Sequence, residues 1–167
     1  MTKTSSLAAQ LDEFDIKILD ALQDNNQRTS EELANLVHLS PASCLRRARR
    51  LRETKVIVAD VSIVAPEVIG PRMTMIVLVS FEREQHDLID SFKASMRADP
   101  QVTQCYYVTG TVDFVLFVSA RDLADYERFT QKFFFENRNV KKFETMVVMS
   151  CAKFDISVRT SVAMSGH

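Results

Sequence analysis

The stretch that decides the fold runs from Thr29 to Lys55 and reads TSEELANLVHLSPASCLRRARRLRETK. Thr29 and Glu32 have the spacing of a capping box, which predicts the start of a helix of about two turns. Ser40 and Pro41 then supply a capping hydroxyl and a proline in the first helical turn, where a missing N–H costs little. The spacing therefore predicts two helices joined by a tight turn, which is the plan of a helix-turn-helix.

Small and apolar residues around the turn fit the same plan. Ala34 falls where the two helices cross closely, and Leu39 falls where an apolar plug is required. His38 occupies the turn. We interpret it as a turn residue rather than a metal ligand, because histidine adopts left-handed backbone more readily than a β-branched residue does.

A further helix precedes this motif. Asp12 is placed to cap it and Asp15 lies in its first turn. An apolar stripe with the 3.6-residue period of a helix follows, formed by Ile16, Leu19, Ala21 and Leu22.

Charge is strongly separated along the chain, although the net charge of the 167 residues is only −1. Residues 12–32 hold seven acidic and two basic residues, whereas residues 44–55 hold six basic residues and one acidic residue. A helix this basic suits the phosphate-lined groove of duplex DNA. Charge alone leaves a solvated helix surface as an equal alternative.

The order of residues along the basic helix favours DNA. A helix in the major groove needs a small, polar first turn, followed by long cations. We predict DNA contacts from Ser40, Ala42, Ser43, Arg46, Arg47 and Arg50, with Arg28 and Ser30 on the phosphate backbone. Within that set, Arg46 and Arg47 are expected to read bases, and Arg50 has the alternative of pairing with Glu53 or with an acid of the first helix. Arg49 and Arg52 are expected to contact phosphates or solvent.

Composition divides the chain into two domains. Residues 1–64 form the helix-turn-helix domain, in which the β-branched residues of Val56–Ile63 predict a wing or a linking strand. Residues 65–71 hold two of the four prolines and one of the three glycines, as a hinge does. Residues 72–156 form the second domain, and residues 157–167 lack periodicity and are expected to be a loose tail.

The second domain has the order strand, helix, strand, strand, helix, strand. This order predicts a ferredoxin-like βαββαβ fold, with an antiparallel sheet covered by two helices on one face, so that the whole chain is of the α+β class. The expected strands are 72–82, 102–109, 114–120 and 142–154, and the expected helices are 87–98 and 122–137. Because residues 75–79 are apolar at successive positions, both faces of the sheet are expected to be buried, the second one by another copy of the chain.

The chain resembles the Lrp/AsnC (feast/famine, leucine-responsive) family of transcriptional regulators over nearly its whole length. The motifs that carry the resemblance are Leu11-Asp12-x-x-Asp15-x-x-Ile18-Leu19, Glu32-Leu33-Ala34, Leu39-Ser40-Pro41, Arg47-x-x-Arg50-Leu51 and Cys105-Tyr106-Tyr107-Val108-Thr109-Gly110-Thr111-Val112-Asp113-Phe114. It implies a winged helix-turn-helix domain followed by an effector-binding and dimerisation domain, called a RAM domain. Two positions depart from the family pattern, since Lys55 and His38 stand where glycine is usual.

In that family the second domain binds a free amino acid between subunits. The resemblance places the effector-binding residues at Tyr107, Val108, Thr109, Gly110, Thr111, Val112 and Asp113, with pocket walls at Leu123, Thr145, Met146, Val147 and Val148. A glycine turn can direct backbone N–H groups at a carboxylate, and Asp113 offers a charge to an ammonium group. The alternative is that Gly110 only supplies positive φ in a hairpin and Asp113 only bonds that turn.

The remaining features bound the function. There is no catalytic or phosphate-binding motif, and the three cysteines have no C-x-x-C pair, so we expect neither an enzyme, nor a metal, nor a cofactor other than the effector. No apolar stretch is long enough to cross a bilayer and no secretory signal is seen, which predicts a cytoplasmic protein of a bacterial or archaeal nucleoid. We expect a sequence-specific regulator that forms a homodimer, tetramer or octamer. An architectural nucleoid protein without effector response, or the regulatory subunit of an enzyme, are the alternatives.

Overall fold

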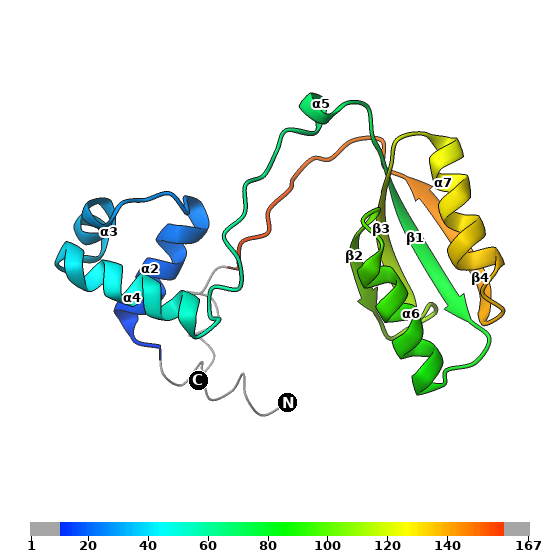
Figure 1. Ribbon diagram of the computed structural model, residues 1–167, viewed down its shortest axis with the longest axis horizontal. Helices are drawn as coiled ribbons and strands as arrows, with labels where there is room; N and C mark the ends of the chain where they lie inside the picture. Colours follow the sequence, from blue (N-terminus) through cyan, green and yellow to red (C-terminus); the bar gives the residue numbers. More distant parts are fainter. Residues whose placement is uncertain (1–10, 159–167) are drawn as a thin grey trace. The chain divides into compact units, whose positions relative to one another are not determined.

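A computed structural model describes residues 11–158, which form two compact units (Figure 1). The described part of the first unit consists of residues 11–63 and 154–158, and the second unit spans Val64–Lys153. Each unit is described by itself. Within the described ranges, no helix has the length and apolar character required to cross a bilayer.

The described part of the first unit has three helices, and each begins where its capping residue predicts. Helix α2 spans Glu13–Asp24, α3 spans Ser30–Val37 and α4 spans Pro41–Glu53. The expected capping box of Thr29 with Glu32 is formed, and Asp12, expected as a cap, forms a second capping box with Asp15. The Ser40 hydroxyl accepts a hydrogen bond from the Ser43 N–H, so that α4 starts at Pro41.

One apolar core holds the three helices together. Ile18 of α2, Val37 of α3 and Leu51 of α4 are almost completely buried within it. Ala34 is buried at 8% exposure, and Leu39 packs against the core as the expected plug. These contacts confirm the helix-turn-helix.

Two residues that carry a side chain, His38 and Lys55, adopt the left-handed backbone conformation that glycine adopts most easily. His38 caps α3 at φ 58° and ψ 45°, which confirms it as the turn residue. Lys55 follows the end of α4 at φ 60°. The chain therefore makes at both positions the turn that glycine would make with less strain.

The expected wing is not formed. Residues 56–65 are all described, and none of them belongs to a strand. Val56 and Ile57 pack against the helical core, and the Ile57 N–H bonds the Leu51 carbonyl, but the exposed residues that follow have no ladder partner. β-branched alternation predicts an extended chain, whereas a strand also needs a neighbour. The hinge region contains one helical turn, α5, at Pro66–Ile69.

The C-terminal described residues belong to the first unit. The Gln23 side chain of α2 bonds both backbone groups of Val158, donating to the carbonyl at 2.9 Å and accepting from the N–H at 2.6 Å. Residues 154–156, expected in the second domain, therefore group with the helices. Of the expected tail, residues 159–167 lie outside the described residues.

The second unit is the expected α+β fold. Its strands are β1 (Met73–Phe81), β2 (Val102–Tyr107), β3 (Phe114–Ala120) and β4 (Val140–Val147). The helices that cover the sheet are α6 (His86–Ala98) and α7 (Leu123–Thr130), which a π-helical turn η1 (Gln131–Phe135) extends. The strand order is β2-β3-β1-β4, and each neighbouring pair is antiparallel. Both helices pack on the same buried core of the sheet.

Strand β4 ends earlier than the sequence predicts. We expected it over residues 142–154, but its ladder ends at Val147, with one further bond from the Val148 N–H to the Thr74 carbonyl. Its partner β1 begins at Met73, which the same register would place opposite residue 149, so residues 150–154 of the expected strand have no residue of β1 to pair with. The length of β1 thus limits how far β4 can extend.

The two faces of the sheet have different surroundings. Met75, Val77 and Val79 are fully buried beneath the helices. Cross-strand register places a second set of apolar side chains on the opposite face, which we call the open face. Its central members are Ile76, Leu78, Tyr106, Val115, Phe117 and Met146. Within one chain this face is uncovered, with Tyr106 at 51% and Met146 at 47% exposure, so the expected burial of both faces is not met by the single protomer.

Candidate nucleic-acid interface and effector site

Helix α4 is fixed in rotation by its buried residues. Cys44, Ala48 and Leu51 face the core of the first unit. Arg46 and Arg49 then lie on the solvent side of the helix. Within residues 11–158, Arg46 has no ion-pair partner.

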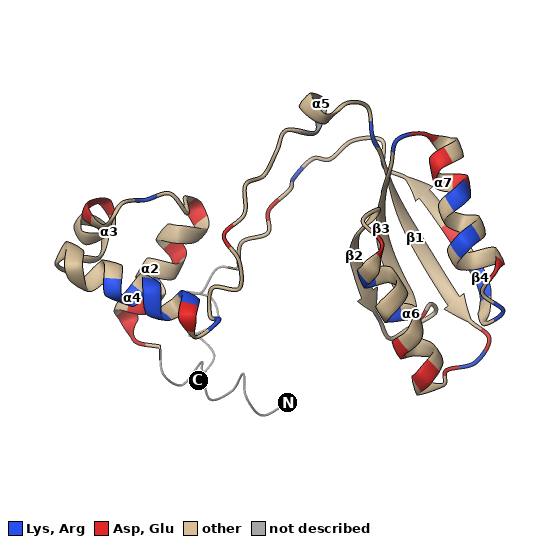
Figure 2. Ribbon diagram, viewed as in Figure 1, with Lys and Arg blue, Asp and Glu red and all other residues tan. Residues whose placement is uncertain are grey.

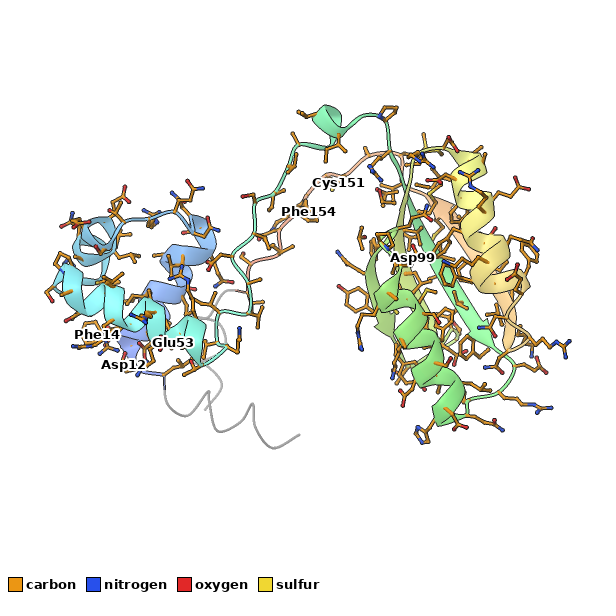
Figure 3. The ribbon with its side chains drawn as sticks, in the orientation of Figure 1. Asp12, Phe14, Glu53, Asp99, Cys151 and Phe154 are labelled. Carbon is orange, nitrogen blue, oxygen red and sulfur yellow. The ribbon has the colours of Figure 1, made fainter. Side chains whose placement is uncertain are left out.

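Arg47, expected to read bases, has its guanidinium bound by carboxylates of the chain itself. Its Nη1 donates to both carboxylate oxygens of Asp12, at 2.8 and 2.9 Å, and to Asp15 Oδ1 at 2.8 Å. The guanidinium also lies 5.6 Å from the centre of the Phe14 ring, close enough for a cation–π contact. Only 23% of the Arg47 side chain is exposed (Asp12 and Phe14 are labelled in Figure 3).

Arg50 is held by the same acid. Its Nη2 donates to Asp15 Oδ2, which confirms the alternative that it pairs with an acid of the first helix. The Asp15 side chain is 1% exposed, and it also accepts a bond from the Asp12 N–H as part of the capping box. One buried carboxylate therefore joins the start of α2 to two turns of α4.

These contacts keep both partners charged. The pKa of Asp12 is lowered from its ordinary value, first by the bond from the Asp15 N–H and then by Arg47. The pKa of Arg47 is raised, chiefly by its hydrogen bond to Asp15. Figure 2 marks the basic residues along α4 and the acidic residues of α2. The basic surface of α4 is smaller than its sequence suggests, because two of its arginines are paired with acids at the start of α2.

The other expected DNA contacts lie at the surface with local partners. Arg49 pairs with Glu53 at 2.8 Å, and Arg52 pairs with Asp60 at 2.8 Å. Arg28 donates from Nε to the Ala21 carbonyl at 3.1 Å and is half-buried, while the Ser30 hydroxyl bonds Glu31. Ser40 and Ser43 bond each other at 3.0 Å at the start of α4, next to the exposed Ala42.

In the second unit, the expected effector residues form a turn that is tied to the sheet. The Val108 N–H bonds the Asp113 carbonyl, and the Asp113 N–H bonds the Val79 carbonyl, both at 2.9 Å. Asp113 Oδ2 accepts a bond from the Phe81 N–H at 2.7 Å. Gly110 lies at φ 134°, where a side chain would be strained. The structure therefore contains the contacts that the alternative interpretation expects, in which Gly110 supplies positive φ and Asp113 bonds the hairpin turn.

The structure divides the expected effector residues between two hollows. Thr111 and Val112 line one of about 260 Å³, together with Leu78, Ser80, Lys142 and Glu144. Tyr107 lines another, between α6 and β2, and its ring lies 5.1 Å from that of Phe114 on the helix-covered side. Thr109 and Gly110 are exposed at the turn, and Val108 is half-buried.

The expected pocket walls are also spread out. Leu123 is 64% exposed at the start of α7, and the Thr145 hydroxyl bonds the Tyr126 hydroxyl at 2.5 Å beneath that helix. Met146 and Val147 are exposed at 47% and 46%, and Val148 is half-buried. No three His, Cys, Asp or Glu side chains within residues 11–158 are grouped as a metal site would need.

Lys142 and Glu144 were not predicted from the sequence. They form an ion pair on β4, two residues apart and therefore on the same face of the strand. Their alternation with Phe143 was the available signal, but only the cross-strand register with Leu78 and Ser80 places them beside Thr111.

Comparison with known proteins agrees with this architecture. Residues 11–52 match a family model described as an AsnC-type helix-turn-helix domain, and residues 74–158 match one described as the Lrp/AsnC ligand binding domain. The HTH-type transcriptional regulator y4tD of Sinorhizobium fredii is 52% identical over 90% of this chain and 89% of its own. The leucine-responsive regulatory protein of Haemophilus influenzae is 32% identical over 86% of each chain.

A solved structure has the same fold. It is a transcriptional regulator of Neisseria meningitidis in complex with L-Met, 29% identical to this chain, with a TM-score of 0.83 over 93% of this chain and 100% of that one.

The role of the buried carboxylate can be tested by Asp15→Ala. We expect the first unit to lose about 3 kcal/mol of stability, because removing Asp15 leaves Arg50 without its acid and breaks the capping box. Urea unfolding followed by helical circular dichroism measures this change. The matched control is Glu13→Ala in the same helix, whose exposed pair with Lys17 contributes less than about 0.5 kcal/mol. Equal effects of the two variants would show that Asp15 has no such role.

Proposed function

The chain belongs to the Lrp/AsnC family of transcriptional regulators, and from this premise we propose that α4 reads a specific sequence in duplex DNA under the control of an amino acid bound by the second unit. The observation that carries the proposal is the exposed surface of α4. It has a small polar first turn and one unpaired arginine beyond it, on a helix held in place by buried ion pairs.

We assign base reading to Arg46. It lies one turn beyond Ala42 and Ser43 on the solvent side, so that its guanidinium can reach a guanine edge once the first turn has entered the groove. Arg49 is 79% exposed and, among the described residues, is paired only with Glu53 on the same helix. Such a pair contributes about 0.3 to 0.5 kcal/mol, so a phosphate can replace the carboxylate.

Arg47 receives a different role, as a positioning residue. Its guanidinium would have to leave two carboxylates before it could bind a base. Its contribution to DNA binding is to hold α4 against α2 and so to direct Arg46. The expected base-reading set is thereby reduced from two arginines to one.

For the effector we propose a zwitterionic α-amino acid. Its site is the hollow lined by Thr111, Val112, Lys142 and Glu144, which we call the hollow beside Gly110. Lys142 offers a cation for the carboxylate, and Glu144 offers an acceptor for the ammonium group, at opposite ends of an existing ion pair. Leu78 and Val112 supply the apolar wall for a side chain. The L-Met complex of the related Neisseria regulator supports this ligand class.

We further propose that the open face pairs two copies of the chain. Monomeric proteins rarely expose a contiguous apolar patch of this kind, and its apolar residues occur on all four strands. The hollow beside Gly110 includes Leu78 of the same face, so a partner would close it on one side. An amino acid that prefers one assembly then changes DNA binding by linkage.

Arg46→Ala is expected to reduce the ratio of specific to random DNA affinity by about tenfold or more, since a bidentate arginine–guanine contact contributes about 1 to 3 kcal/mol of discrimination. Affinities are measured by fluorescence anisotropy on sites enriched from a random library and on scrambled DNA. Arg128→Ala, an exposed arginine of the second unit, is the control. An unchanged ratio in Arg46→Ala would favour an architectural DNA-binding protein instead.

The effector proposal is tested by a thermal-shift screen of the twenty common L-amino acids. At least one is expected to raise the melting temperature, because a ligand that binds only the folded state stabilises it. Glu144→Gln and Asp113→Ala should abolish that shift while operator binding survives. Asp113→Asn keeps an acceptor for the Phe81 N–H and separates loss of charge from loss of the hairpin bond. If Asp113→Ala loses operator binding as well, Asp113 has a structural role.

Ile76→Glu tests the pairing of the open face. Burying an unpaired carboxylate at the centre of an interface is expected to weaken self-association by about 100-fold or more. Sedimentation velocity over a concentration series measures the change. Ala94→Glu, on the exposed side of α6, is the control. Assembly that is the same in both variants would place the subunit interface elsewhere.

A further inference from the structure

A second hollow, between α6 and β2, is separate from the proposed amino acid site. It has a volume of about 380 Å³, and its lining includes Lys93 and Arg97 of α6 and Tyr107 of β2. It shares no lining residue with the hollow beside Gly110. The amino acid site proposed above does not use it, although its lining includes Tyr107, one of the expected effector residues.

Its charge is positive and almost uncompensated. Lys93 and Arg97 are one helical turn apart and therefore share a face of α6. None of the described residues that line the hollow is acidic. Asp90, which pairs with Lys93 at 3.6 Å, is 76% exposed, and Arg97 has no ion-pair partner within residues 11–158. Two cations in a half-enclosed site attract an anion.

Both cations act on the interior of the hollow rather than only on solvent. Lys93 and Arg97 each exert an electrostatic effect on the Cys105 thiol, which lines the hollow. Burial nevertheless raises the pKa of that thiol above its ordinary value, so at neutral pH it carries no charge to balance them. The positive potential therefore remains available to a ligand.

The rest of the lining suits the carbon chain of an organic ligand that carries a charge at each end. The Lys93 ammonium lies 4.7 Å from the centre of the Tyr107 ring, which holds the cation over an aromatic platform. Val102 supplies apolar surface, above the fully buried Met96. β2 is an edge strand, so the outer side of its backbone also offers hydrogen-bonding groups that the sheet does not use.

We propose that the hollow between α6 and β2 is a second small-molecule site, distinct from the amino acid site, that binds an organic dicarboxylate through Lys93 and Arg97. A dicarboxylate matches the two cations in charge, and its carbon chain matches the apolar floor. A zwitterion fits less well, because the lining formed by residues 11–158 has no carboxylate for an ammonium group.

The experiment titrates the full chain with glutarate by isothermal calorimetry, with amide chemical shifts as the second readout. Glutarate is expected to bind and to perturb residues of α6 and β2, whereas glutaramide, its neutral analogue of similar shape, should not bind. Arg97→Gln and Lys93→Gln should each weaken glutarate binding by about tenfold or more. Both side chains are partly or fully exposed, so neither change disturbs the core.

The matched control is Arg128→Gln, which removes an exposed arginine from α7 and should leave glutarate binding unchanged. The proposal is overturned if glutarate gives neither heat nor shift changes, if glutaramide binds equally well, or if Arg97→Gln binds glutarate as the wild type does. The thermal shift with L-amino acids is measured on the same variants. If Arg97→Gln abolishes that response too, this hollow is the effector site rather than a second one.

Discussion

The first unit depends on one buried carboxylate. Asp15 is almost without solvent exposure, and a charge so placed must be neutralised and hydrogen-bonded by its neighbours. Arg47 and Arg50 of α4 neutralise the charge, and the Asp12 N–H of the capping box donates a further hydrogen bond to the carboxylate. The two helices are thus held at a fixed rotation. Because successive residues turn by about 100° around a helix, holding Arg47 against α2 directs Arg46 to solvent.

The second unit depends on the alternation of its strands. Every second residue of β1 and β3 enters the core beneath α6 and α7, and the residues between them form the open face. The Asp113 carboxylate links the β2–β3 turn to the end of β1, so the Gly110 turn is held at one edge of that face. A ligand at the turn and a partner on the open face therefore act on neighbouring parts of one sheet, which gives a physical basis for coupling assembly to ligand binding.

Local signals predicted the helices well. The capping residues Asp12, Thr29 and Ser40 mark the helix starts because a cap acts within four residues, and His38 lies in the left-handed turn for the same local reason. The order of strands and helices after residue 72 was also predictable from periodicity. Strand ends were not, since β1 is too short to pair with residues 150–154 and residues 56–65 have no strand partner. Of the residues in the proposed effector site, the turn around Gly110 was predicted from the sequence, whereas Lys142 and Glu144 were not.

The sequence by itself determined which segments are helices and strands, which faces are apolar and where basic residues concentrate, because each of these is written in spacing over a few residues. The tertiary structure alone decided which arginines of α4 are paired with acids of the chain and which lie in solvent. Arg46 and Arg47 are neighbours of identical chemistry, yet one lies in solvent and the other contacts acids 32 and 35 positions earlier in the chain. No local pattern distinguishes them, because the difference arises only when α2 packs against α4 and the buried Asp15 requires a counter-charge.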